Sequence, residues 1–217
     1  MTMDPKAPER PKSVVMGRDN ACIPLLLDMH AVPDPIILDA CYNTGKMWKG
    51  LPYKVTSMDI DPVMKCDFTA SFTDMPFADD SFDVVAFDPP HLPNANASNN
   101  RTTGLADVYG IRVQDDMRAA DHVGGMFTPF LLEARRVLRP SGIVIAKIAD
   151  LVHNHAYQWQ HVDFIEAARA TEGMTPCDLI VKVDPASANL SSSKWQKVHH
   201  FRRAHLYWIV IRKGKCE

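Results

Sequence analysis

The sequence has no excess of charge of either sign and no long apolar run. Its 217 residues carry 24 lysines and arginines against 26 acidic residues, a formal net charge of −2. Such a balance is ordinary for a globular protein and does not by itself indicate a nucleic-acid partner. No apolar run reaches the length of a membrane-spanning helix, and residues 1–12 are too polar and proline-rich for a signal peptide. These absences predict a cytoplasmic protein with no membrane partner, and the length predicts one domain.

Cysteine is scarce, odd in number and without a C-x-x-C pair. The five cysteines are Cys22, Cys41, Cys66, Cys177 and Cys216. This scatter predicts reduced thiols rather than disulfides or a zinc site. Histidine pairs at 153/155 and 199/200 have no cysteine or carboxylate at ligand spacing, so we predict no metal.

Short apolar runs alternate with segments of helical period. The expected strands are 36–40, 53–58, 64–68, 84–88, 143–148, 177–183 and 206–211. Helices are expected over 21–30, capped by Asn20, from Gly124-Gly125 to Leu138, and over 155–171. The pattern predicts an α/β fold: a seven-stranded, mostly parallel sheet with the last strand antiparallel and helices on both faces. Residues 1–19 are expected to form a flexible lead-in to a single domain over 20–217.

Three expected strands end at an acid: Asp39, Asp59 and Asp88. In a doubly wound sheet such strand ends converge on one crevice, where ligands bind. Gly45 has no side chain, so we expect the turn after Asp39 to approach a ligand closely. Asp59 follows Asp39 by about 20 residues, the spacing at which dinucleotide folds place an acid on ribose hydroxyls. The turn has too little glycine for a nicotinamide fingerprint, which disfavours a dehydrogenase.

The fourth strand runs directly into Asp88-Pro89-Pro90-His91. The two prolines lack N–H donors, so they stiffen the backbone and leave carbonyls unpaired. A carboxylate beside such carbonyls is rich in acceptors and suits an amino group. The alternative from these residues alone is an ordinary turn that closes a strand.

Two polar segments are candidate substrate contacts. Residues 91–125 lack a clear period and are expected to form a substrate-facing loop. Residues 186–205 are expected to form a basic loop whose cations and aromatic ring could follow a phosphate backbone, the alternative being a solvated surface loop. The nucleic-acid-binding candidates are Arg101, Lys194, Trp195, Lys197, Arg202 and Arg203.

Over residues 20–213 the chain resembles the class I S-adenosylmethionine-dependent methyltransferases. Ile37-Leu-Asp-Ala-Cys-Tyr-Asn-Thr-Gly45 resembles their first motif and Ser57-Met-Asp-Ile-Asp61 their second. The segments 75–83 and 133–142 are also similar to common family segments. Asp-Pro-Pro-His91 resembles the Asp-Pro-Pro-aromatic motif of amino-group methyltransferases acting on DNA adenine or cytosine. Asn43 stands where glycine is usual, and His91 where an aromatic residue is usual.

The resemblance implies a Rossmann-like sheet, S-adenosylmethionine as cofactor, and methyl transfer to N6 of adenine or N4 of cytosine. Asp88 and the Pro89 carbonyl would accept the amino hydrogens, with Pro90 and a stacking His91 completing the catalytic set. DNA is the favoured partner over RNA. The alternatives are an RNA amino-methyltransferase, a small-molecule or protein methyltransferase, and a non-catalytic cofactor-binding protein. The implied cofactor-binding residues are Asp39, Ala40, Cys41, Asn43, Gly45, Asp59, Ile60, Asp67, Phe68 and Asp88.

Overall fold

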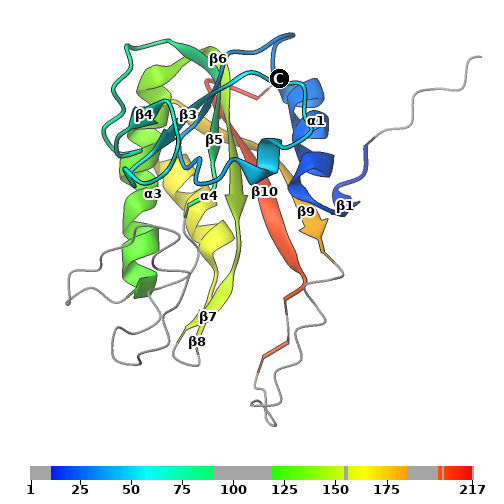
Figure 1. Cartoon of the computed structure of the whole chain (residues 1–217). Coiled ribbons are helices and arrows are strands. Elements are labelled where there is room, and N and C mark those ends of the chain that lie inside the picture. Colours follow the sequence, from blue (N-terminus) through cyan, green and yellow to red (C-terminus); the bar gives the residue numbers. More distant parts are fainter. Residues whose placement is uncertain (1–10, 90–118, 154–155, 185–199, 202, 217) are drawn as a thin grey trace, which may run out of the picture.

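A twisted sheet runs through the middle of the molecule (Figure 1). A computed structural model describes residues 11–89, 119–153, 156–184, 200–201 and 203–216. Within them the main sheet has eight strands in the order β1-β9-β10-β6-β5-β2-β3-β4. Their bounds are β1 Val14–Met16, β2 Ile37–Asp39, β3 Val55–Asp59, β4 Phe68–Thr69, β5 Phe82–Phe87, β6 Leu138–Ile148, β9 Met174–Val183 and β10 His205–Lys213.

All neighbouring strands of this sheet are parallel except where β10 is inserted antiparallel between β6 and β9. The prediction of a mostly parallel sheet with an antiparallel last strand is confirmed. The eighth strand, β1, was not expected. It lies within residues 1–19, so part of the expected lead-in belongs to the sheet and pairs with β9.

Helices cover both faces of the sheet. Helices α3 (Ala119–Val137) and α4 (Gln160–Ala170) lie on one face, and α1 (Asp19–His30) lies on the other (Figure 1). Alternate β5 side chains enter the two cores: Val85 and Phe87 pack toward α3, while Val84 and Ala86 pack toward α1. Because both faces of the strand are buried there, its sequence from Val84 to Phe87 is a continuous apolar run.

Three predicted helix starts differ from the structure. The N-cap of α1 is Arg18 rather than Asn20, which puts Asp19 in the first turn, where a negative charge is favourable. The helix expected from Gly124 begins at Ala119. The helix expected over 155–171 was wrong at its start: β7 (Leu151–His153) and β8 (Ala156–Gln158) form a hairpin first. The backbone N–H of His161, in the first turn of α4, is satisfied by Asp150, a partner from before the hairpin that local sequence does not indicate.

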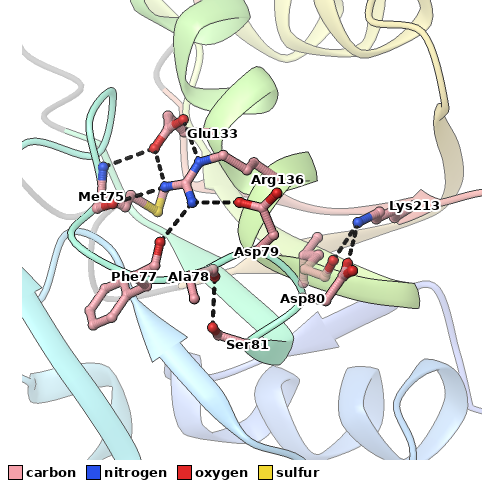
Figure 2. A network of polar contacts seen from close by, with 10 residues as sticks. Met75, Phe77, Ala78, Asp79, Asp80, Ser81, Glu133, Arg136 and Lys213 are labelled. Atoms are coloured by element: carbon pink, nitrogen blue, oxygen red, sulfur yellow. Dashed lines mark hydrogen bonds and ion pairs between the residues drawn. The ribbon is translucent and has the colours of Figure 1, made fainter.

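The loop before β5 is held against α3 by a polar network, far from the carboxyl ends of the strands (Figure 2). Arg136 donates to both carboxylate oxygens of Glu133, at 3.0 and 2.8 Å, and to the carbonyls of Phe77 and Met75 at 2.6 and 2.9 Å. It also pairs with Asp79 at 3.0 Å. The family-like segments 75–83 and 133–142 therefore form one structural unit at the edge of the sheet where β5 begins.

The expectation of reduced thiols throughout was wrong for one pair. Cys177 and Cys216 form a disulfide, with their Cα atoms 5.7 Å apart. After β10 the chain turns at Gly214, whose φ of 112° is a conformation that favours glycine, and this turn brings Cys216 back beside β9. Cys22, Cys41 and Cys66 are free.

Neither a membrane span nor a metal cluster occurs in the part of the chain that the structure describes. No helix there is long and apolar enough to cross a bilayer. No group of three or more histidine, cysteine or acidic side chains is arranged there to hold a metal ion.

Candidate active site

The acids at the ends of β2, β3 and β5 lie together. Strand β2 is paired in parallel with both β3 and β5, so the carboxyl ends of the three strands lie side by side at the same end of the sheet. Burial is the main cause that raises the pKa of Asp39, and the nearby charges of Asp88 and Asp59 raise it further. The Cys41 thiol is close to the same acids, and its pKa is raised chiefly by burial and further by their charges. The structure thus brings together the acids that follow three neighbouring strands, Asp39, Asp59 and Asp88, as the sequence predicts.

Asp39 organises the turn after β2. Its side chain is completely buried, and it accepts hydrogen bonds from the Cys41 backbone N–H at 3.0 Å and from Trp48 Nε1 at 2.7 Å. Trp48 belongs to the short 3-10 helix η1 (Lys46–Trp48). Burial raises the pKa of Asp39 to about 7, more than its two hydrogen bonds lower it. Asp39 therefore holds both ends of the segment 40–48 in place through these two hydrogen bonds.

The same turn contains two residues in the left-handed conformation, Asn43 with φ 49° and Gly45 with φ 62°. Asparagine tolerates this conformation better than most residues, which accounts for its presence where the resemblance expects glycine. A Cβ on Gly45 would collide with the ring of Tyr42. The Cβ side of Gly45 is therefore filled by that ring, and the approach of a ligand to the backbone of this turn stays a prediction.

Asn43 also carries an acceptor without a donor. Its backbone N–H donates to Asp59 Oδ2 at 2.7 Å, which ties the turn to the end of β3. Its side-chain Oδ1 is buried and has no hydrogen-bond partner among the residues that the structure describes. A buried oxygen of this kind costs free energy until a donor reaches it. A bound ligand with an N–H or O–H group would supply that donor.

Asp59 and Asp67 lie at the β3 and β4 end of the site. Asp59 Oδ1 accepts from the Asp61 N–H at 3.0 Å, so each of its oxygens has one partner and capacity for another. Asp67 Oδ2 accepts from the backbone N–H and the hydroxyl of Ser57, at 2.8 and 2.7 Å, and these bonds lower its pKa. Ile60 and Phe68 are apolar yet 58% and 40% exposed, which provides apolar surface beside these acids.

Asp88 is engaged by a lysine that the sequence reasoning missed. Lys147 Nζ lies 2.9 Å from Asp88 Oδ2 and 3.1 Å from Asp19 Oδ2. The sequence feature that could have indicated this lysine is its place as a single cation inside the apolar run of β6. Strands β5 and β6 pair with Phe87 opposite Ala146, so residues 88 and 147 are the next neighbours across the two strands. Pro89 is buried, whereas Pro90 and His91 lie outside the described residues.

A second group missed from sequence follows β6 at the same edge of the sheet. The buried Asp150 lies 2.7 Å from His161 Nδ1 and accepts from the Tyr157 hydroxyl at 3.2 Å. The His161 ring stacks on Tyr207 at 4.0 Å, and the Tyr157 ring contacts Trp159 at 4.3 Å. Tyr157, Trp159, His161 and Tyr207 form what we call the aromatic cluster. Trp159 is 56% exposed, so the cluster has aromatic surface open to solvent.

Among the nucleic-acid-binding candidates the structure describes Arg203. Its guanidinium lies over the ring of Tyr157, 5.4 Å from the centroid, beside the aromatic cluster. The other candidates, Arg101, Lys194, Trp195, Lys197 and Arg202, lie outside the described residues, as do most of the expected loops 91–125 and 186–205.

Comparison with solved structures identifies the fold. No protein-family model and no curated protein matches the sequence. An S-adenosylmethionine-dependent methyltransferase from Methanosarcina mazei superposes with a TM-score of 0.53 at 12% identity, over 87% of this chain and 97% of that one. A provisionally named sarcosine dimethylglycine methyltransferase from Galdieria sulphuraria gives 0.52 at 13% identity, over 90% and 85%. The provisionally named methyltransferase bound to the Trm112 activator of Haloferax volcanii gives 0.51 at 17% identity, over 88% and 92%.

These likenesses show that the chain has the Rossmann-like fold of S-adenosylmethionine-dependent methyltransferases. At identities of 12 to 17% they establish the fold and leave the acceptor open.

Proposed function

We propose that the protein is an S-adenosylmethionine-dependent methyltransferase that modifies an exocyclic base amine, N6 of adenine or N4 of cytosine, with DNA as the favoured acceptor. The observation that carries this proposal is the position of Asp88 and Pro89. These two residues directly follow β5 and lie beside the turn held by Asp39 and Asp59. The fold around them is shared with S-adenosylmethionine-dependent methyltransferases.

The residues at this edge suit the cofactor. S-adenosylmethionine presents an ammonium group, two ribose hydroxyls and an adenine amine, all of which donate hydrogen bonds. The edge supplies acceptors: the unpartnered Asn43 Oδ1, the Asp59 carboxylate and the Asp67 carboxylate. Ile60 and Phe68 add exposed apolar surface suited to an adenine ring. Ala40, Cys41 and Gly45 would contribute through the backbone of the turn. When bound, the cofactor supplies an activated methyl group on a sulfonium centre.

The chemistry asks for positioning more than for acid–base catalysis. A charged carboxylate accepts hydrogen bonds and donates none, and the ion pair with Lys147 favours the charged form of Asp88. Asp88 and the Pro89 carbonyl would hold the two amino hydrogens, which directs the nitrogen lone pair and raises its nucleophilicity. Positioning of this kind can supply most of a rate enhancement. We assign Pro90 and His91 to the same substrate-holding segment, with His91 stacking on the base.

The acceptor class rests on the basic and aromatic residues around the site. Arg203 lies beside the exposed Trp159, and we assign Arg101, Lys194, Trp195, Lys197 and Arg202 to contacts with the phosphate backbone. A base in a duplex would have to flip out to reach Asp88. Residues 91–125 would face the substrate, and residues 186–205 would form the basic loop of the single domain.

One observation favours a second candidate, a cofactor-binding protein without catalysis. Lys147 occupies one hydrogen-bonding position of Asp88 Oδ2, the oxygen that an amine could otherwise use. In that case the turn around Asp39 would bind S-adenosylmethionine while no acceptor would be methylated.

The test is incubation with labelled S-adenosylmethionine and, separately, DNA, RNA or bulk protein, followed by nucleoside analysis. We expect labelled N6-methyladenine or N4-methylcytosine from DNA. Label in RNA would select the RNA alternative, and label in protein would contradict a base acceptor. Calorimetric titration with S-adenosylmethionine separates the remaining cases: binding without transfer to any acceptor supports the non-catalytic candidate, and no binding refutes both.

A further inference from the structure

We infer that Lys147 is a positioning residue for Asp88, holding its carboxylate in place and in the charged form for methyl transfer. The inference rests on the proposed function and assigns a role to a residue outside the motifs that resemble the methyltransferase family.

Lys147 is an inner member of a short chain of alternating charges that runs from Asp88 to Lys182. Its ammonium group contacts Asp88 at 2.9 Å and Asp19 at 3.1 Å, and the other oxygen of Asp19 pairs with Lys182 at 2.8 Å. Two cations and two anions balance, so the group adds no net charge to the interior. The chain connects the end of β5 to β6, to the first turn of α1 and to β9.

Burying the Lys147 ammonium costs free energy unless opposite charges compensate it. Its side chain is 16% exposed and lies in a strand whose other residues from Ile143 to Ile148 are buried and apolar. Burial lowers the pKa of Lys147, but Asp88 and Asp19 raise it more, so the ammonium stays charged. Removing one partner of a buried ion pair strongly destabilises a protein, because the charge that remains is left uncompensated. Asp88 without Lys147 would therefore lose a positive charge that favours its carboxylate form.

The pairing of β5 with β6 makes the contact rigid. Residues 88 and 147 follow the paired Phe87 and Ala146, so the ammonium reaches Asp88 from a strand rather than from a loop. Lys147 also contacts Asp19, at 3.1 Å, so its ammonium lies between two carboxylates. A carboxylate held from a rigid element keeps the geometry that in-line transfer to an amine requires, and small misplacements there are expensive in rate.

Lys182 provides the matched control. It is similarly buried, with 8% of its side chain exposed, and it pairs with Asp19, whereas the ion pair with Asp88 is made by Lys147. Lys147→Met and Lys182→Met remove the same charge from the same network. Loss of stability alone would affect both variants, whereas a positioning role belongs to Lys147.

The experiment compares Lys147→Met, Lys147→Arg and Lys182→Met by kcat, acceptor KM and S-adenosylmethionine Kd. We expect Lys147→Met to lower kcat by roughly 10- to 100-fold while Kd changes by less than about threefold. Lys147→Arg should recover part of the loss because it restores the charge, and Lys182→Met should keep kcat within about threefold. Equal losses in the two methionine variants, or an unchanged kcat in Lys147→Met, would overturn the inference.

A titration that does not depend on activity completes the test. Carboxyl-carbon NMR of Asp88, assigned with the Asp88→Asn variant, should show its titration midpoint moving to higher pH in Lys147→Met. Among the described residues, Asp39 and Cys41 of the turn after β2 lie near Asp88, and Asp19 of α1 contacts the same ammonium; the substitution changes none of these three. An unmoved midpoint refutes the inference.

Absence of transfer by the unsubstituted protein would instead refute the proposed function, and the NMR result would still stand. If Lys147→Met does not fold, Asp19→Asn gives the converse test. Lys147 then keeps Asp88 as its charged partner, so kcat and the Asp88 midpoint should stay close to those of the parent protein. A large loss of kcat in folded Asp19→Asn would count against the inference.

Discussion

Arg136 and Glu133 form a two-bond ion pair within one turn of α3, and the same guanidinium reaches the carbonyls of the loop before β5 (Figure 2). We expect Arg136→Met to lower the free energy of unfolding by about 2–3 kcal/mol, because charge-assisted bonds are lost and Glu133 keeps only the Met75 N–H. Urea denaturation measures this. Arg135→Met, which removes a single exposed bond to a carbonyl, should cost less than about 1 kcal/mol. Equal costs would mean that the network does not hold the loop.

Asp39 should make stability depend on pH. Its pKa in the folded protein is about 7, against a usual value of 3.8, so the folded state holds its proton to higher pH than the unfolded chain does. The free energy of unfolding should therefore fall as pH rises from about 4 to about 7, by up to about 4 kcal/mol from this group. Denaturation at several pH values should give a flatter curve for Asp39→Asn. An identical slope in both proteins would contradict this pKa.

Asp88→Ala should abolish methyl transfer and preserve cofactor binding. We expect kcat to fall by roughly a hundredfold or more, since the acceptor that holds the amine is gone. Lys147 keeps Asp19 as a partner, so the fold should persist. Asp79→Ala, at the opposite edge of the sheet with 74% of the side chain exposed, is the control and should retain full activity. Parallel loss of transfer and of S-adenosylmethionine affinity would make Asp88 a cofactor or folding residue instead.

The Cys177–Cys216 disulfide should be detectable and stabilising. Mass spectrometry of peptides prepared without reductant should recover the two cysteines linked. Because the bond closes a loop of 39 residues in sequence separation, Cys216→Ser should lower the free energy of unfolding by about 2–4 kcal/mol. Cys66→Ser, which removes a free thiol, should cost little. Two free thiols at 177 and 216 under non-reducing conditions would contradict the bond.

Removing charge from the basic segment should weaken nucleic-acid binding. We expect replacement of Lys194, Lys197, Arg202 and Arg203 by glutamine to lower affinity for DNA. The slope of log affinity against log salt should also become shallower, by about 0.9 for each phosphate that the variant no longer neutralises. Fluorescence anisotropy with a labelled duplex at several salt concentrations measures both. Replacing Lys46, the first residue of η1, and Lys49, its C-cap, gives a control with altered net charge. An unchanged slope in the basic-segment variant would remove the role proposed for it.

The sheet could be predicted from sequence because its signals are local. The apolar run Val84–Phe87 lies within β5, and an acid follows it directly. The helical period lies within α3. What could not be predicted depends on residues far apart in the chain. Asp19 pairs with Lys182 across 163 positions, and the start of α4 depends on Asp150 on the other side of a hairpin. The same limit applies to the disulfide, since a cysteine's partner is set by the path of the chain.

The pairing of β1 with β9 has a consequence for synthesis on the ribosome. Val14 aligns with Val181, so β1 stays without its partner strand until residue 181 has been made. At about 5–20 residues per second, the first strand waits roughly 8–30 s for its partner. During that interval the apolar side of α1 also lacks β10, which supplies Trp208 and Val210 to the same core. The nascent protein should therefore be a client of chaperones that shield exposed apolar surface until the last strands emerge.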